Sequence, residues 1–170
     1  MMLGMSLASF TLLHVLISLL GIATGLVVVF GMVTSRKLDG WTALFLVSTI
    51  LTSITGFLFP FERVLPSHVF GVISLALLAA AVVARYGYRL AGGARWVYVV
   101  TSVAALYLNA FVGVVQTFLK ISFFNTLAPT QTELPFFVGQ GITLLAFVAL
   151  GFFAVRAFRP LDGRSALNAA

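Results

Sequence analysis

Five stretches of the chain are built almost wholly from apolar residues, and charged residues occur only at their ends. They run roughly over residues 8–33, 41–60, 66–85, 96–119 and 137–156. Each is long enough for the ~20 residues that an α-helix needs to cross the hydrocarbon core of a bilayer. The connections are short, and 61% of all residues are hydrophobic while 8% are charged, so no room remains for a soluble domain. The sequence predicts an all-α membrane protein: one integral domain, a bundle of five transmembrane helices in contact with the lipid bilayer.

Basic residues are unevenly distributed between the two ends of this predicted bundle. Eight of the ten lie at one end, and only Arg63 and Lys120 lie at the other. Because lysine and arginine are enriched in cytoplasmic loops, we expect the basic end to be cytoplasmic, with the N-terminus outside and the tail of residues 157–170 inside. Aromatic side chains with a polar atom favour the membrane interface and gather at the same end. They are Trp41, Trp96, Tyr86, Tyr88 and Tyr98.

The sequence also argues against several classes of function. The spans carry no charged residue away from their ends, which disfavours the proton relays of ion-coupled transporters. No motif of a hydrolase, a metalloprotease or a phosphate-binding loop occurs, so we identify no catalytic residues and do not expect an enzyme by itself. The net charge of +6 comes from separate juxtamembrane loops, so we expect no nucleic-acid binding. Cysteine is absent, which removes disulfides and thiolate chemistry.

Small and neutral polar residues form a stripe at helical spacing on the first span. His14, Ser18, Gly21 and Gly25 share one face, and the two glycines form a G-x-x-x-G pair that permits close helix packing. This face is expected to meet another helix. Through Gly21 and Gly25 the chain would also assemble as a homo-oligomer or join a larger membrane complex.

Similar stripes occur on the second and fourth spans. An unpaired amide in lipid costs several kcal/mol, so Asn109 and Gln116 on the fourth span are expected to face the bundle interior. The hydroxyls of the second span can bond to their own helix or to a neighbouring one. That stripe contains Thr42, Thr49, Ser53 and Gly56, with Thr52 beside it.

The two histidines of the chain and two glutamines are predicted to lie at a similar height. At 1.5 Å per residue, His14, His68, Gln116 and Gln140 lie roughly 24–33 Å from the basic anchors of their helices, near the outer membrane boundary. Together with Asn109 they form the candidate cofactor-binding site. Each histidine also fits a simpler role as an interfacial or helix-capping residue.

Two ligands suit this candidate site. Neutral imidazoles from separate helices can hold an iron between them, so His14 and His68 are predicted to be metal ligands of one haem b. The alternative is that the same residues form hydrogen bonds to a quinone head group. Phe57, Phe59 and Phe70 are apolar rings that would cover a haem. Copper and zinc are less favoured, because two histidines supply too few ligands.

Three short segments carry a resemblance to known proteins. GWTALF at 40–45, TSITGFLFPF at 52–61 and LPSH at 65–68 resemble a group of small uncharacterised bacterial inner-membrane proteins, which implies that location. More distantly, a histidine on the first helix, a Thr-Gly end to the second and a histidine at the start of the third resemble small bacterial membrane proteins suspected of binding haem b. Paired histidines on a single helix, as in several b-type cytochromes, do not occur, so two haems are not expected.

Three functions follow from these patterns. The first is a haem b or quinone site at the periplasmic end of the bundle, acting in or beside membrane electron transfer. The second is a non-catalytic structural or accessory subunit of a membrane complex. The third is passage of a small neutral solute along the stripe of Asn109 and Gln116.

Overall fold

The computed structural model describes residues 4–60 and 66–159, which form helices and connecting turns. No β-strand occurs in this part of the chain, so the all-helical prediction is confirmed. The elements in chain order are α1 (Leu7–Val33), α2 (Asp39–Gly56), α3 (Pro66–Val82), the π-helical turn η1 (Val83–Gly87), α4 (Ala94–Lys120), α5 (Ser122–Leu127) and α6 (Leu134–Ala157).

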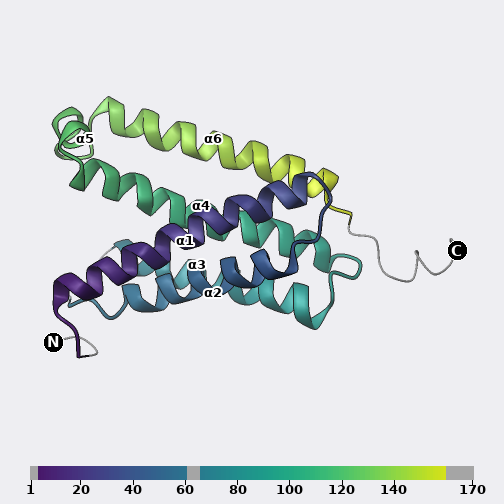
Figure 1. The fold of residues 1–170 in the computed structure, drawn as a ribbon. Coiled ribbons are helices and arrows are strands. Elements are labelled where there is room, and N and C mark those ends of the chain that lie inside the picture. The colour runs from purple at the N-terminus through teal and green to yellow at the C-terminus, as the bar shows by residue number, and fades with distance from the viewer. Residues whose placement is uncertain (1–3, 61–65, 160–170) are drawn as a thin grey trace, which may run out of the picture.

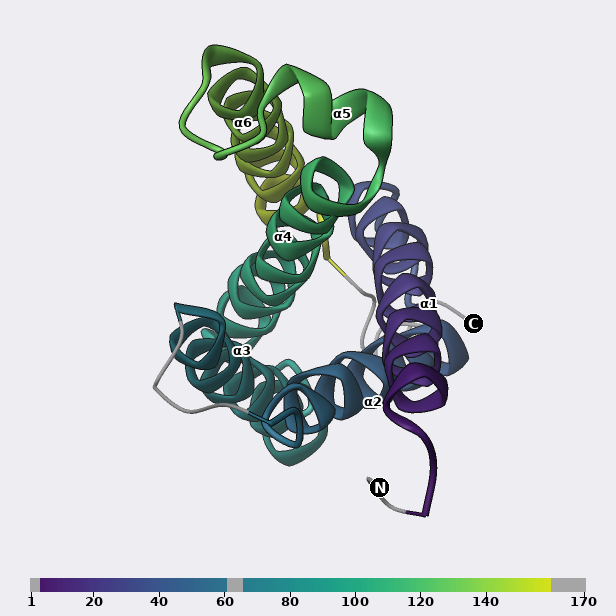
Figure 2. The same cartoon turned by 90° about the vertical axis from the view of Figure 1, so that its left-hand side faces the viewer.

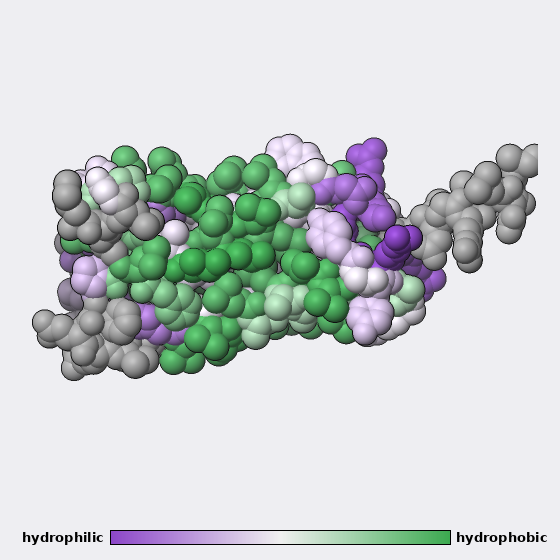
Figure 3. Space-filling model, turned by 90° about the horizontal axis from the view of Figure 1, so that it is seen from below, coloured by the Kyte–Doolittle hydropathy of each residue, from purple (hydrophilic) through white to green (hydrophobic). Residues whose placement is uncertain are grey.

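Four helical segments are long and apolar enough to cross a membrane. They are α1, the continuous helix His68–Gly87, α4 and α6. The surface around them is apolar: Phe30 is 67% exposed and Leu145 is 70% exposed. Figure 3 shows this as a broad hydrophobic band that separates two more polar ends. Such a band is what contact with lipid requires, because nothing else in residues 4–60 and 66–159 covers these side chains.

The first four helices form the body of the bundle. α1 packs along α2, α2 along α3, and α3 along α4, while α1 also crosses α4 (Figure 1). Viewed from the end where α1 begins, these four helices are arranged in a ring (Figure 2). α6 packs against α4 and meets α1, and the short helix α5 connects α4 to α6.

The glycine face of α1 lies at the helix crossing, as the sequence predicts. A Cβ on Gly25 would lie 2.5 Å from Leu106 Cδ1 and 2.8 Å from Phe45 Cε2. A Cβ on Gly21 would lie 3.0 Å from Thr49 Oγ1. Both glycines are buried against α2 and α4 of the same chain. The two glycines therefore pack within the chain, and assembly with another copy or with a larger complex stays a prediction.

Two residues of the basic end lie deeper than expected. Arg85 is 5% exposed and forms an ion pair with Asp39 at the start of α2, while its guanidinium lies 5.1 Å from the ring centre of Tyr98. Tyr98 is 1% exposed, and its hydroxyl lies 3.3 Å from Thr42 Oγ1. Tyr98 is therefore a core residue and not an interfacial one. The carboxylate of Asp39 accounts for the burial of Arg85, because a buried charge needs a bonded partner.

Two further differences from the sequence prediction lie at the opposite end of the bundle from the basic residues. The second helix ends at Gly56 and not at residue 60, and the predicted loop of residues 121–136 contains the short helix α5. The tail beyond residue 159 and the predicted outer loop of residues 61–65, which includes Arg63, lie outside the described residues.

We expect Gly25→Ala to destabilise the bundle by about 1–3 kcal/mol, because the added methyl group would overlap Leu106 and the ring of Phe45. Gly141→Ala on α6 is the matched control, since a Cβ there meets nothing within 4 Å. That change should be neutral or add about 0.5–1 kcal/mol of helix stability. Thermal unfolding in detergent, followed by tryptophan fluorescence, compares them. Equal melting temperatures for the two variants would contradict the crossing described above.

Candidate functional site

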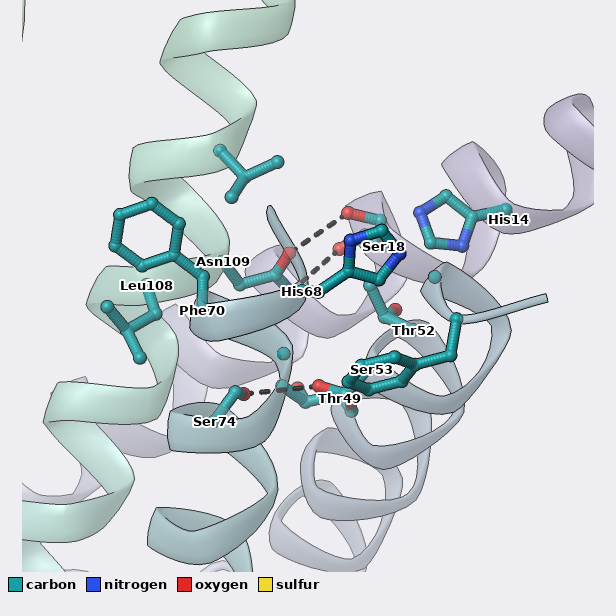
Figure 4. Close-up of a pocket in the computed structure, with 14 residues that line it drawn as sticks. His14, Ser18, Thr49, Thr52, Ser53, His68, Phe70, Ser74, Leu108 and Asn109 are labelled. Atoms are coloured by element: carbon teal, nitrogen blue, oxygen red, sulfur yellow. Dashed lines mark hydrogen bonds between the residues drawn. The ribbon is translucent and has the colours of Figure 1, made fainter. Parts of the chain in front are cut away.

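A cavity of about 120 Å³ lies between α1, α2, α3 and α4 (Figure 4). Its walls combine hydrogen-bonding side chains with apolar ones, and no described residue that lines it is charged. The polar side chains are those of His14, Ser18, Thr49, Thr52, Ser53, His68, Ser74 and Asn109. The cavity therefore offers neutral donors and acceptors inside a bundle whose outer surface is apolar.

Helical spacing explains how these side chains converge. His14 and Ser18 are one turn apart on α1, Thr49 and Ser53 are one turn apart on α2, and each pair faces the cavity. The hydroxyls of Ser53 and Ser74 lie 3.1 Å apart and link α2 to α3. The polar stripes that the sequence places on separate helices thus meet in one place.

His14 and His68 line the same cavity, from α1 and α3. The Nδ1 atom of His14 lies 2.8 Å from Thr55 Oγ1, and its ring meets that of Phe59 edge-on at 5.2 Å. The ring of His68 lies 5.7 Å from that of Phe57. Both histidines are thus packed against phenylalanine rings from the segment that follows α2.

The position of Phe57 depends on a glycine in the facing helix. A Cβ on Gly71 would lie 2.8 Å from Phe57 Cζ, so the ring rests directly on the backbone of α3. Phe70, also on α3, lines the cavity and contacts the ring of Phe111 on α4 at 5.1 Å between ring centres. Two aromatic side chains therefore form part of the cavity wall.

Asn109 faces the interior, as the sequence predicts. It is 8% exposed, its Oδ1 accepts a hydrogen bond of 3.0 Å from the Ser18 hydroxyl, and its Nδ2 donates to the Ser18 carbonyl at 3.4 Å. Both bonds appear in Figure 4. They join α4 to α1, so Asn109 holds the two helices together at the cavity wall.

One buried hydroxyl of the cavity has no partner. Thr49 is 1% exposed, and its Oγ1 makes no hydrogen bond within the described part of the chain. It does not bond back to the carbonyl of Phe45 one turn earlier, which the Ser48 hydroxyl contacts at 3.1 Å instead. Thr49 Oγ1 exposes less than 1 Å² and lies close to Gly21 of α1, so a ligand in the cavity does not reach this hydroxyl as the side chain stands. The sequence places Thr49 on the polar stripe of the second span but contains no signal that its hydroxyl lacks a partner.

Gln116 and Gln140, both predicted to be site residues, do not line the cavity. Gln116 is exposed, because α1 and α4 diverge beyond their crossing and leave that part of α4 uncovered (Figure 1). Gln140 is 9% exposed, and its Nε2 donates to the Phe111 carbonyl at 3.2 Å, so it joins α6 to α4. The cavity thus contains three of the five predicted residues: His14, His68 and Asn109.

The arrangement suits recognition of an uncharged ligand. The described residues contain no group of three or more His, Cys, Asp or Glu side chains that could hold a metal ion. His14 and His68 are the residues of the cavity that could hold a cofactor through a ring nitrogen. Hydroxyl, amide and imidazole groups would form hydrogen bonds to a ligand, while Phe57 and Phe70 would contact its apolar faces.

Comparison with known proteins gives no match to any family model, curated protein or solved structure.

We expect Thr49→Val to leave the stability of the free protein unchanged or to raise it by up to ~1 kcal/mol, because valine keeps the shape and removes an unpaired buried hydroxyl. Thr24→Val on α1 is the matched control. Thr24 is equally buried, and its hydroxyl donates to the Leu20 carbonyl at 2.7 Å, so its loss should cost about 0.5–1.5 kcal/mol. Unfolding midpoints in detergent measure both. If Thr49→Val lowered the free energy of unfolding as much as Thr24→Val does, the Thr49 hydroxyl would have a hydrogen-bond partner in solution.

Proposed function

We propose that this chain is a bacterial inner-membrane protein that crosses the bilayer five times, with its N-terminus outside and the cavity at the periplasmic end. The fifth span is α2, which packs between α1 and α3. The hydroxyls of Ser48, Thr52 and Thr55 donate to carbonyls one turn earlier in α2, which removes most of their cost in lipid. The excess of basic residues at the opposite end supports the orientation.

Cysteine labelling tests this topology, because the natural chain contains no cysteine. Ser35 and Ser122 are both exposed and follow the ends of α1 and α4 respectively. In intact cells a membrane-impermeant thiol reagent should label Ser122→Cys but not Ser35→Cys, and disruption of the membrane should expose both. Labelling of Ser35→Cys alone from outside would reverse the orientation, and labelling of both would contradict five spans.

For the ligand, we propose the head group of a quinone, bound beside membrane electron transfer. The observation that carries this proposal is a small neutral cavity that combines two imidazoles, hydroxyls and an amide with aromatic side chains. Quinone head groups are uncharged rings whose oxygens form hydrogen bonds, and their hydrocarbon tails dissolve in lipid. His14 and Asn109 would contact the oxygens, and Phe57 and Phe70 would contact the ring.

The volume of the cavity favours a quinone over haem b. A volume of about 120 Å³ is close to the ~150 Å³ of an engineered cavity that holds one benzene ring, so it is on the scale of a single ring. Pockets for drug-sized molecules measure about 300–1,000 Å³, and a haem is at least as large as such molecules. A haem held by His14 and His68 would require the helices around the cavity to move apart.

The two other functions expected from the sequence have less support. A path for a neutral solute along Asn109 and Gln116 loses one of its two residues, since Gln116 lies outside the cavity. Assembly as an accessory subunit through Gly21 and Gly25 loses its surface, since both glycines are buried within the chain.

We expect the purified protein to bind a short-chain quinone in its oxidised or its reduced form, and His14→Ala to weaken binding of the form that binds more tightly about tenfold or more, because the ligand loses a buried hydrogen bond. Gln116→Ala removes a polar side chain outside the cavity and should leave binding unchanged. Equilibrium dialysis in nanodiscs measures the affinities. Equal loss in both variants, or no binding by the natural chain, would contradict the proposal, and a Soret band in the visible spectrum would indicate haem instead.

A further inference from the structure

The hydrogen bonds around His14 determine which nitrogen of its neutral ring carries the proton. Its Nδ1 lies 2.8 Å from Thr55 Oγ1. The Thr55 hydroxyl donates its single proton to the Leu51 carbonyl at 2.7 Å, with the Thr52 carbonyl at 3.2 Å as a weaker acceptor. Thr55 Oγ1 can therefore only accept from His14, and the proton of the neutral imidazole resides on Nδ1.

The other ring nitrogen then faces the cavity as an acceptor. With the proton on Nδ1, the Nε2 atom of a neutral imidazole carries a lone pair. Nε2 lies on the ring edge away from Thr55, and the ring extends from α1 toward Ser18 and His68, as Figure 4 shows. The ligand group that fits this position is one that donates a hydrogen bond.

The form of the ligand follows from this acceptor. A ligand hydroxyl can donate a hydrogen bond to His14 Nε2. A carbonyl oxygen placed at Nε2 would instead bring two lone pairs together and leave both unpaired.

We propose that the cavity binds the reduced, hydroquinone form of its ligand in preference to the quinone. This inference rests on the proposed function, because it selects between the two redox forms of the same head group. A quinone offers only acceptors, whereas a hydroquinone offers two hydroxyl groups that donate as well as accept. The preference between the two redox forms arises from Thr55. Its hydroxyl accepts a hydrogen bond from His14 Nδ1, which leaves Nε2 as the acceptor.

The test compares durohydroquinone with duroquinone under anaerobic conditions at neutral pH, using the full chain in nanodiscs. Isothermal titration should give about tenfold tighter binding of durohydroquinone, the effect of one buried hydrogen bond satisfied against one left unpaired. Equal binding, or tighter binding of duroquinone, would overturn this inference and leave the quinone site itself standing. Binding of neither compound would overturn the proposed function as well.

A substitution at Thr55 tests the cause of the preference. Thr55→Val removes the acceptor at Nδ1, so the neutral ring is free to carry its proton on Nε2, and the ratio of the two affinities should fall toward one. Thr143→Val is the matched control, because the Thr143 hydroxyl also bonds one turn back, to the Gly139 carbonyl, but lies on α6 outside the cavity. Thr143→Val should therefore leave the ratio of the two affinities at the value measured for the natural chain. An unchanged ratio in Thr55→Val would show that Thr55 does not direct His14.

Discussion

Pairing of polar groups without help from water is the constraint on which this bundle depends. A helix in lipid can satisfy its own backbone, but each buried side-chain donor or acceptor must find a partner within the chain. Most do so here: Ser18 bonds to Asn109, and Arg85 bonds to Asp39. Four buried side-chain atoms in the described part of the chain have no partner: Thr49 Oγ1 beside the cavity, and Arg85 Nε, Ser102 Oγ and Gln140 Oε1 away from it. The capacity of the cavity to hold a ligand arises, by inference, from His14 Nε2 and from the aromatic side chains that line it.

The crossing of α1 and α4 determines where that region lies. Gly25 lets the two helices approach until Leu106 and Phe45 fill the space between them. On one side of this contact, Asn109 reaches Ser18 and closes one wall of the cavity. The close contact and the cavity are therefore neighbouring parts of one packing arrangement, in which small residues bring the helices together and polar residues line the space beside them.

Much of the fold follows from the sequence, and the reason is that hydropathy and helical period act locally. The positions of the long helices and the inward face of Asn109 depend only on residues of the same helix. Gln116 lies two turns further on the same stripe, yet it is exposed, because its environment depends on the angle at which α1 crosses α4. The burial of Tyr98 and Arg85 likewise depends on Asp39 at the start of a different helix. Contacts of this kind involve side chains distant in sequence, which a one-dimensional pattern does not encode.

The sixth helix makes a different contribution from the other long helices. α6 supplies none of the described residues that line the cavity, which come from α1 to α4 and from Phe57 after the end of α2. Hydrogen bonds hold α6 near both ends. Gln140 donates to a carbonyl of α4 near the start of α6. At the basic end, Arg95 donates to the Phe158 carbonyl, and the Arg159 amide donates to the Ser35 hydroxyl. The chain thus combines four helices that line the cavity with one long helix, α6, that packs beside them. Substitutions on the outward face of α6 can therefore change which neighbouring molecules the protein contacts in the plane of the membrane. The residues that line the cavity stay the same.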